Sequence, residues 1–168
     1  MTLEEKPVYR SYVKLERHSL QAQWDTGAQI SVCTKSLATK LGLKWAKLEK
    51  ELNMVTIDGK KSPSIGIVEN AGLKILDVKV PINIHIVDSI KKELLLGSNW
   101  FAKYKADLIL SKNLLKFQME GKKFQVKIVN TPAKSLTMNW YKEDEDIEVI
   151  SVGSDSDKGS VLSEQAAN

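Results

Sequence analysis

Alternation of apolar and polar residues is the feature that most limits what this chain can fold into. The pattern is strictest in DVKVPINIHIV, residues 77 to 87, where Lys79, Asn83 and His85 lie between regularly spaced apolar residues. These apolar residues are Val78, Val80, Ile82, Ile84 and Ile86. Because successive side chains of a strand point to opposite faces, the pattern predicts one half-buried strand. Pro81 cannot donate a backbone hydrogen bond, so we expect this strand near a sheet edge.

Weaker alternation recurs along the body of the chain and predicts a mainly β fold. Turn-forming sequences such as SKN and EGKK separate the other predicted strands. These strands cover residues 12–16, 20–24, 114–119 and 124–129. Residues 54–68 predict a hairpin, in which an Asp58-Gly59 turn and a tip of Lys, Ser and Pro residues join two strand-like segments.

Two short helices are expected to interrupt the strands. Residues 34–43 offer Thr34 or Ser36 as an N-cap and Gly42 as a C-terminal stop. Residues 98–106 follow Gly97 and carry aromatic residues at helical spacing. We expect these aromatic side chains in the core rather than at a ligand.

The chain of 168 residues is long enough for one well-packed domain and an appendage. We predict a domain at residues 1–130 and an acidic, mostly disordered tail at residues 131–168. The tail holds 8 Asp or Glu and 3 Lys, a net charge of −5, and its apolar content is too low to offset its ordering entropy. The body is basic, but no aromatic residues are interleaved with a basic stripe, so a solubilising surface is favoured over nucleic-acid binding.

Cys33 is the only cysteine, which excludes an internal disulfide and fits a reducing compartment. No apolar run approaches the roughly 20 residues of a membrane helix, and the N-terminus is unlike a secretory signal. We therefore expect an intracellular protein, cytoplasmic or nuclear, without membrane contact. Cys33 and a histidine could form a nucleophile and base, but Cys33 is more simply a buried apolar residue and His85 lies on a polar face. Two His and one Cys do not supply a tetrahedral metal site.

One carboxylate stands out, because Asp25 in QAQWDTGAQIS lies between a bulky apolar residue and a turn. Gly27 would let the backbone turn closely, Thr26 could hydrogen-bond the loop, and Ala28 would keep the space behind it small. Asp-Thr-Gly alone occurs by chance, so an ordinary Asx-turn is the simpler interpretation. Two later features of the sequence favour a functional role for Asp25. They are the Gly-containing hairpin and LLLGSNWF, in which Leu95, Leu96 and Gly97 lead into the second predicted helix.

With these three pieces in this order, the sequence resembles the retroviral-type, or retropepsin-like, aspartic proteases. It is most similar to those of gypsy-type LTR retrotransposons and of the DNA-damage-inducible ubiquitin-receptor proteins. The matching pieces are WDTGAQISVCTKSLATKLGL, the hairpin, which looks like the family's flap, and VKVPINIHIVDSIKKELLLGSNWFAKYKADLILSKNLLKF. The resemblance covers residues 8 to 129. It implies a closed-barrel-like acid protease fold, a single lobe with a flap hairpin and one or two short helices, as a two-fold homodimer.

By this resemblance Asp25 is the catalytic residue of an aspartic endopeptidase, and Thr26, Gly27 and Ala28 complete the active-site loop. The chemistry needs two carboxylates that share one proton, one to activate water and one to polarise the scissile carbonyl. The chain has a single Asp-Thr-Gly, so the second Asp25 must come from a second copy across a two-fold axis. Leu95, Leu96 and Gly97 would pack behind the loop. No metal or organic cofactor is implied.

The flap would close over an extended peptide that lies as an added strand. Its expected substrate-binding residues are Ile57, Asp58, Gly59, Lys60 and Lys61. The basic tip could favour acidic substrate side chains. Gln23 and Trp24 depart from the family, which usually has two aliphatic residues before the catalytic Asp. Gln23 would polarise a subsite wall, and Trp24 would need more space in the core.

The tail contains one further motif, the β-prone stretch IEVI between acidic and Ser-Asp clusters. It resembles the motif that binds small ubiquitin-like modifiers by adding a strand to their sheet edge, with Ile147, Val149 and Ile150 as apolar contacts. An acidic solubilising tail or a polyprotein linker without a partner is the simpler alternative.

Three functions therefore stay open. The first is a homodimeric endopeptidase that processes a retroelement polyprotein, and the second is a host-domesticated protease that cuts cellular proteins. The third is a catalytically inactive dimeric module of the same fold that binds proteins. The intact Asp-Thr-Gly argues against the third function, and nothing in the sequence separates the first two.

Overall fold

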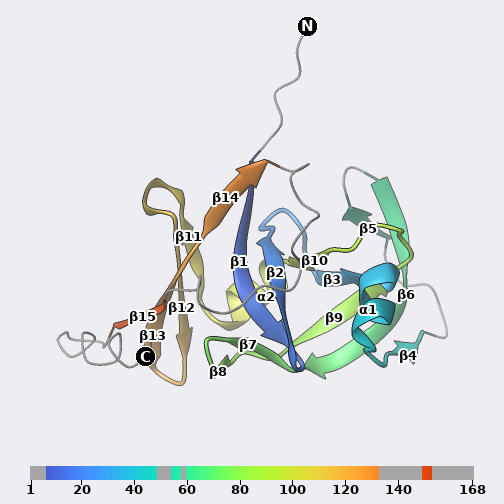
Figure 1. Ribbon diagram of the computed structural model, residues 1–168, viewed down its shortest axis with the longest axis horizontal. Helices are drawn as coiled ribbons and strands as arrows, with labels where there is room; N and C mark the ends of the chain where they lie inside the picture. Colours follow the sequence, from blue (N-terminus) through green and yellow to red (C-terminus); the bar gives the residue numbers. More distant parts are fainter. Residues whose placement is uncertain (1–6, 49–53, 58–59, 133–148, 153–168) are drawn as a thin grey trace, which may run out of the picture.

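The structure, a computed structural model, describes residues 7–48, 54–57, 60–132 and 149–152. These residues form two β-sheets and a few short helices (Figure 1). The larger sheet consists of β1 (Pro7–Leu15), β2 (His18–Trp24), β3 (Ser31–Thr34), β4 (Ala46–Lys47), β5 (Met54–Ile57), β6 (Lys60–Ala71), β7 (Leu73–Ile75), β8 (Val78–Lys79), β9 (Ile82–Val87), β10 (Leu94–Leu96) and β14 (Val129–Pro132). The smaller sheet consists of β11 (Asp107–Ile109), β12 (Leu114–Met119), β13 (Lys122–Lys127) and β15 (Val149–Val152). The helices are α1 (Lys35–Leu41), α2 (Ser98–Lys103) and the 3-10 helix η1 (Leu110–Lys112).

The order of strands in the larger sheet is β4-β6-β9-β3-β10-β2-β1-β7-β8, with β14 added to β1 and β5 to β6. Two pairs are parallel, β10 with β2 and β3 with β9. Because β10 lies between β2 and β3, the connection from β2 to β3 passes over the end of β10, where α2 begins. This mainly β architecture, with the β5–β6 hairpin and two short α-helices, confirms the predicted fold class.

Both predicted helices form at the expected places. Thr34 is the N-cap of α1, and its side-chain oxygen accepts a hydrogen bond from the Leu37 N–H. Gly42 ends the helix in the left-handed conformation, with φ of 72°. α2 starts directly after Gly97 but ends at Lys103, three residues earlier than predicted.

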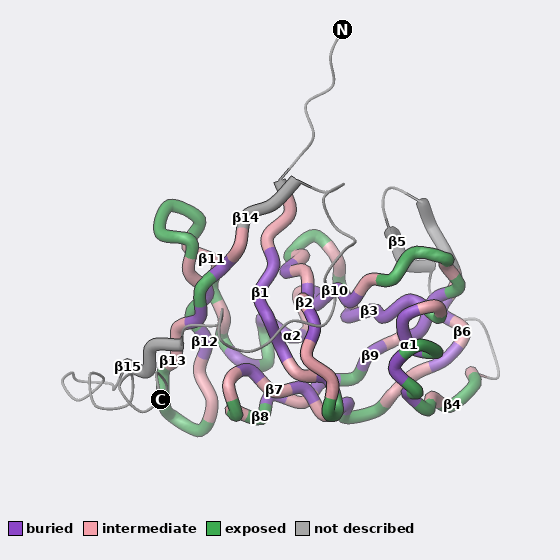
Figure 2. Tube along the Cα trace, viewed as in Figure 1, coloured by how far each residue is buried: buried purple, intermediate pink, exposed green. Residues whose placement is uncertain are grey.

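The core lies between the strands of the curled larger sheet and α2, and Figure 2 shows buried residues in β1, β2, β3 and β9. Trp100 is fully buried at the centre of an aromatic cluster, which confirms the predicted core role of α2. Ring centroids of four residues lie 4.9 to 5.8 Å from the Trp100 ring, namely Trp24, Phe101, Tyr104 and Phe117. Phe117 belongs to β12, so this cluster joins the two sheets.

The prediction of a single strand at residues 77 to 87 is wrong, because this segment forms two strands, β8 and β9. The Val80 N–H donates to Leu73 O at 2.9 Å, and Pro81, which has no N–H, follows at the break. The predicted edge position holds for β8, the last strand of the sheet, and is wrong for β9, which lies between β6 and β3. The Pro81 carbonyl instead accepts hydrogen bonds from the Tyr104 hydroxyl at 2.6 Å and the Lys103 ammonium at 3.1 Å. The break therefore connects the sheet to α2.

The predicted hairpin is confirmed as β5 and β6, which pair from Met54 with Pro63 to Ile57 with Lys60. Residues 60–63 belong to β6, so the predicted tip of Lys, Ser and Pro residues is wrong. Asp58 and Gly59 lie outside the described residues. β6 continues to Ala71 and pairs with β9.

In the described part of the chain, two strands contain residues beyond position 130. β14 crosses that position and pairs with the start of β1, and β15 pairs with β13. The domain boundary and the disordered character of the tail stay predictions, because most of residues 131–168 lie outside the described part of the chain. Among the helices that the structure describes, none has the length and apolar character needed to cross a membrane.

Candidate active site

Asp25 stands at the point where β2 leaves the sheet. Leu20, Ala22 and Trp24 of β2 are buried at every second position, and Asp25 follows as a half-buried residue. Its backbone N–H donates to Leu96 O of β10 at 2.9 Å. The end of β2 is thus fixed against β10 immediately before the chain turns.

The Asp25 loop, residues 25–28, is closed by the aspartate itself. The Gly27 N–H donates to Asp25 Oδ1 at 3.1 Å, and the Ala28 N–H donates to Asp25 O at 3.1 Å. The aspartate therefore does form an Asx-type turn, as the simpler interpretation expected. The same contact fixes the orientation of the carboxylate, while Thr26 and Gly27 remain exposed. Among the described residues Oδ2 has no hydrogen-bond partner, so one carboxylate oxygen stays available.

The start of α2 supports this loop from behind. The Ser98 N–H donates to Ala28 O at 2.7 Å, and the Asn99 N–H donates to Gln29 O at 3.2 Å. A Cβ atom on Gly97 would lie 2.4 Å from Ile30 O and 2.7 Å from Ala28 O, so no larger residue fits there. These contacts confirm the prediction that Leu96 and Gly97 pack behind the loop.

Ser31 and Asn99 are two supporting residues that the sequence analysis missed. Ser31 is completely buried, and its hydroxyl donates to Asn99 Oδ1 at 2.8 Å and accepts from the Gly97 N–H at 3.1 Å. The polar Asn99 shortly after an apolar strand was a visible signal. Its partner Ser31, 68 residues away, was not.

Trp24 fits the core without disturbing the loop. Its Nε1 donates to Ser11 Oγ at 2.9 Å, and Ser11 Oγ donates to Lys127 O at 2.8 Å. The indole thus has a hydrogen-bond partner as well as ring contacts in the aromatic cluster. The space that Trp24 was expected to need is supplied by this cluster. Gln23 is half-buried and pairs with Arg10 of β1 and Leu95 of β10.

The β5–β6 hairpin and the β2–β3 connection lie on the same side of the molecule, the upper side in Figure 1. Of the predicted flap residues, Ile57 and Lys60 face each other in the ladder, and Lys61 pairs with Thr56. The role of these residues, with Asp58 and Gly59, in substrate binding stays a prediction.

The Cys33 and His85 side chains do not form a catalytic pair. Burial raises the pKa of the Cys33 thiol to about 12, and the thiol donates to Thr34 O at 3.5 Å. His85 Nδ1 lies 2.7 Å from Ser64 Oγ, and burial lowers the pKa of this imidazole. In the described ranges no group of three or more His, Cys, Asp or Glu residues is placed to hold a metal ion.

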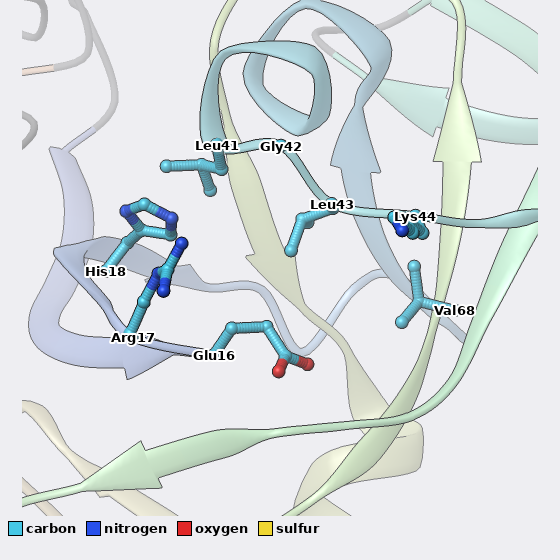
Figure 3. Close-up of a pocket in the computed structure, with 8 residues that line it drawn as sticks. All are labelled: Glu16, Arg17, His18, Leu41, Gly42, Leu43, Lys44 and Val68. Atoms are coloured by element: carbon cyan, nitrogen blue, oxygen red, sulfur yellow. The ribbon is translucent and has the colours of Figure 1, made fainter.

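A cavity of about 460 Å³ lies apart from the loop, at the end of α1 (Figure 3). Arg17, His18 and Lys44 line it beside apolar residues of α1 and β6, and none of its lining residues belongs to the Asp25 loop. Its carboxylate, Glu16, already accepts a hydrogen bond from the Gly72 N–H at 3.0 Å. Because the lining lacks a second carboxylate, the cavity is not a competing site for carboxylate-pair chemistry.

A curled, mainly β lobe with an Asp-Thr-Gly loop supported by Leu-Leu-Gly defines a retropepsin-like aspartic protease fold. The model of the family described as gag-polyprotein putative aspartyl protease matches residues 12–103. The chain belongs to this family.

Two relatives and one solved structure show how far the likeness extends. The UBA domain-containing protein Mud1 of Schizosaccharomyces pombe is 29% identical over 117 residues, which cover 65% of this chain and 33% of that protein. DNA damage-inducible protein 1 of Kluyveromyces lactis is 28% identical over 107 residues, which cover 62% of this chain and 25% of that protein. The retroviral protease-like domain of Ddi1 from Leishmania major matches with a TM-score of 0.56 at 15% identity, over 80% of this chain and 100% of that one. The chain spans a third or less of Mud1 and of the Kluyveromyces protein, and the structural match concerns the fold alone.

Proposed function

We propose that the protein is a homodimeric aspartic endopeptidase, in which the Asp25 carboxylates of two subunits activate the water that attacks a peptide bond. The observation that carries this proposal is the geometry of the Asp25 loop. A carboxylate on an exposed loop has one oxygen held by the Gly27 N–H and the other available, and the loop is fixed to the core from behind. Such a fixed geometry is what positioned acid–base chemistry needs.

The dimer follows from the chemistry of the carboxylate pair. One carboxylate must act as base while the other is protonated, and two such groups close together cannot both ionise. The chain has one Asp-Thr-Gly, and an isologous contact at a two-fold axis would supply its copy. The exposure of Thr26 and Gly27 leaves this part of the loop open to a second subunit. In the dimer, Thr26 would link the two loops and Gly27 would contact the substrate backbone.

The β5–β6 hairpin would act as the flap that closes over the substrate. An extended peptide can add to such a hairpin through main-chain hydrogen bonds while alternate side chains fill pockets. Ile57, Asp58, Gly59, Lys60 and Lys61 would supply these contacts, and the two lysines would favour acidic substrate side chains. The gag-polyprotein family supports a retroelement polyprotein as the substrate. The two relatives are named as a UBA domain-containing protein and a DNA damage-inducible protein, and these names support the alternative of a host-domesticated protease.

Subunit mixing tests the proposal directly. Wild-type protein should cleave a peptide library at acidic to neutral pH, and Asp25→Asn should be slower by about 10²-fold to 10⁴-fold. Excess Asp25→Asn should also suppress the wild type, because mixed dimers hold one carboxylate. Asp107→Asn, which changes an exposed carboxylate on β11, is the matched control and should neither lose activity nor suppress it. Equal cleavage by Asp25→Asn would refute the assignment, and an active monomer in sedimentation would refute the dimer mechanism.

A further inference from the structure

The outer edge of β13 is occupied by a strand from far along the chain. β13 pairs with β12 on one side and with β15 on the other, antiparallel in both cases. The β15 register runs from Val126 opposite Val149 to Lys123 opposite Val152. Without β15, the N–H and C=O groups on this side of β13 would form an open sheet edge, which is a template for strand addition.

Charge favours this particular strand at this particular edge. The β12–β13 hairpin, residues 114–127, holds four Lys and one Glu, a net charge of +3. All four lysines are exposed, namely Lys116, Lys122, Lys123 and Lys127. Residues 143–157, which include β15, hold seven Asp or Glu and no basic residue, a net charge of −7. Opposite charges of this size steer two segments together and select the partner.

The inner side of the same hairpin gives the edge a fixed geometry. Val126 is buried, and the Phe124 ring stacks on Phe117 with a centroid distance of 5.2 Å. Phe117 in turn packs against Trp100 of the core. β13 therefore presents a preformed edge to a short strand of β-branched residues such as Val149, Ile150 and Val152.

We propose that the outer edge of β13 is a strand-docking site whose ligand is the chain's own segment 149–152, and that this docking competes with a small ubiquitin-like modifier for the same segment. The segment contains two of the three apolar residues of the predicted modifier-binding motif, Val149 and Ile150. A modifier would take the segment as an added strand of its own sheet. β13 takes the N–H and C=O groups on one edge of the segment, so a modifier that pairs with the same edge must displace β13.

The first test measures whether the pairing exists in the full-length chain. Ile150→Pro removes a backbone donor from the middle of β15 and should speed amide exchange by about tenfold or more at those residues of 122–127 whose N–H groups face β15. Val161→Pro is the matched control, because it places proline at a β-branched residue of the tail outside β15, and it should leave exchange unchanged. Unchanged exchange in Ile150→Pro overturns the docking site.

The second test measures competition. A peptide of residues 143–157 should bind the modifier more tightly than the full-length chain does. If docking holds the segment nine-tenths of the time, the difference is about tenfold. The double variant Lys122→Glu, Lys123→Glu repels the acidic segment and should bring the full-length affinity close to that of the peptide. Lys35→Glu, Lys44→Glu makes the same change at exposed lysines near the two ends of α1 and should bind like the wild type.

Three outcomes would overturn the competition. They are a peptide that fails to bind the modifier, a full-length chain that binds as tightly as the peptide, and a modifier complex in which residues 122–127 keep their slow exchange. None of these measurements depends on proteolysis, so they succeed or fail independently of the endopeptidase proposal.

Discussion

Gly97 behind the Asp25 loop and Gly66 in β6 both lack room for a side chain. Different kinds of neighbouring atoms fill the space at the two positions. A Cβ on Gly97 would meet three backbone atoms of Ala28 and Ile30, at 2.4 to 2.9 Å. A Cβ on Gly66 would meet Trp45 Cδ1 at 2.2 Å and Nε1 at 2.8 Å, and the backbone only at Ala46 O, at 2.9 Å. Backbone cannot yield without moving the loop, whereas a half-buried side chain such as Trp45 can change rotamer.

The difference between the two glycines distinguishes the Asp25 loop, whose neighbours are fixed backbone atoms, from β6, where a neighbouring side chain can move. Backbone hydrogen bonds to β10 and α2 hold the backbone of the Asp25 loop, and the Gly27 N–H holds one oxygen of the Asp25 carboxylate. β6, the long strand of the proposed flap, pairs with β4 and β9 at Gly66, and the nearest obstacle to a Cβ there is a side chain, Trp45. The Ser64–His85 pair adds a side-chain contact close by. A protease that closes a flap over substrate needs both properties. Four predictions test this contrast, from the largest expected effect to the smallest.

Gly97→Ala should cause the largest loss. The new methyl group must displace Ile30 O and Ala28 O, and with them the whole Asp25 loop. We expect a stability loss of about 3 kcal/mol in urea denaturation and a fall in peptide cleavage of about 10²-fold or more, since small misplacements of catalytic groups are costly. Gly72→Ala is the control, because its Cβ would meet only the movable Glu16 carboxylate at 3.3 Å. Similar losses in both variants would show that backbone crowding at Gly97 is not special.

Ser31→Ala should have the second largest effect. It leaves the buried Gly97 N–H and Asn99 Oδ1 without their hydroxyl partner, which costs about 1–3 kcal/mol. Cleavage should fall mainly through kcat, because the variant changes the support of the loop and not the substrate contacts. Ser36→Ala removes the bond from a partly exposed hydroxyl to Ser89 O and should cost less. Equal costs would argue against a supporting role for Ser31.

The features found from sequence were those whose causes are local. Thr34 and Gly42 cap their own helix, and the Asp25 turn is closed by a residue two positions away, so three or four letters suffice to predict them. The Ser31–Asn99 bond and the division of the strand at Pro81 depend on residues brought together by the sheet order. The pairing of β15 with β13 is also long-range, although its β-prone character was visible. Trp24 looked oversized because its partners, Ser11 and Trp100, are distant in sequence.

Gly66→Ala should cost less than Gly97→Ala, about 1 kcal/mol, because the nearest obstacle is a side chain. The cost should fall further in the background of Trp45→Ala, which removes two of the three close contacts. A double-mutant cycle in urea denaturation measures this coupling. Additive costs would mean that the Ala46 backbone, and not Trp45, excludes a side chain at Gly66, and the contrast between the two glycines would disappear.

Acid should weaken the part of β6 that contains Gly66 before it affects the Asp25 loop. Burial lowers the pKa of His85 below its usual 6.5, so the unfolded chain takes up a proton first as the pH falls. The stability from keeping His85 neutral is present above about pH 6.5 and is lost as the pH falls towards the lowered pKa. His85→Gln should therefore lose less stability than wild type between about pH 7.5 and pH 5.5. Amide exchange should report the change in β6 and β9, which pair at Ile67 and His85, and leave Asp25 and Ala28 unaffected. An identical pH dependence in both proteins would show that the contact with Ser64 does not couple β6 to protonation of His85.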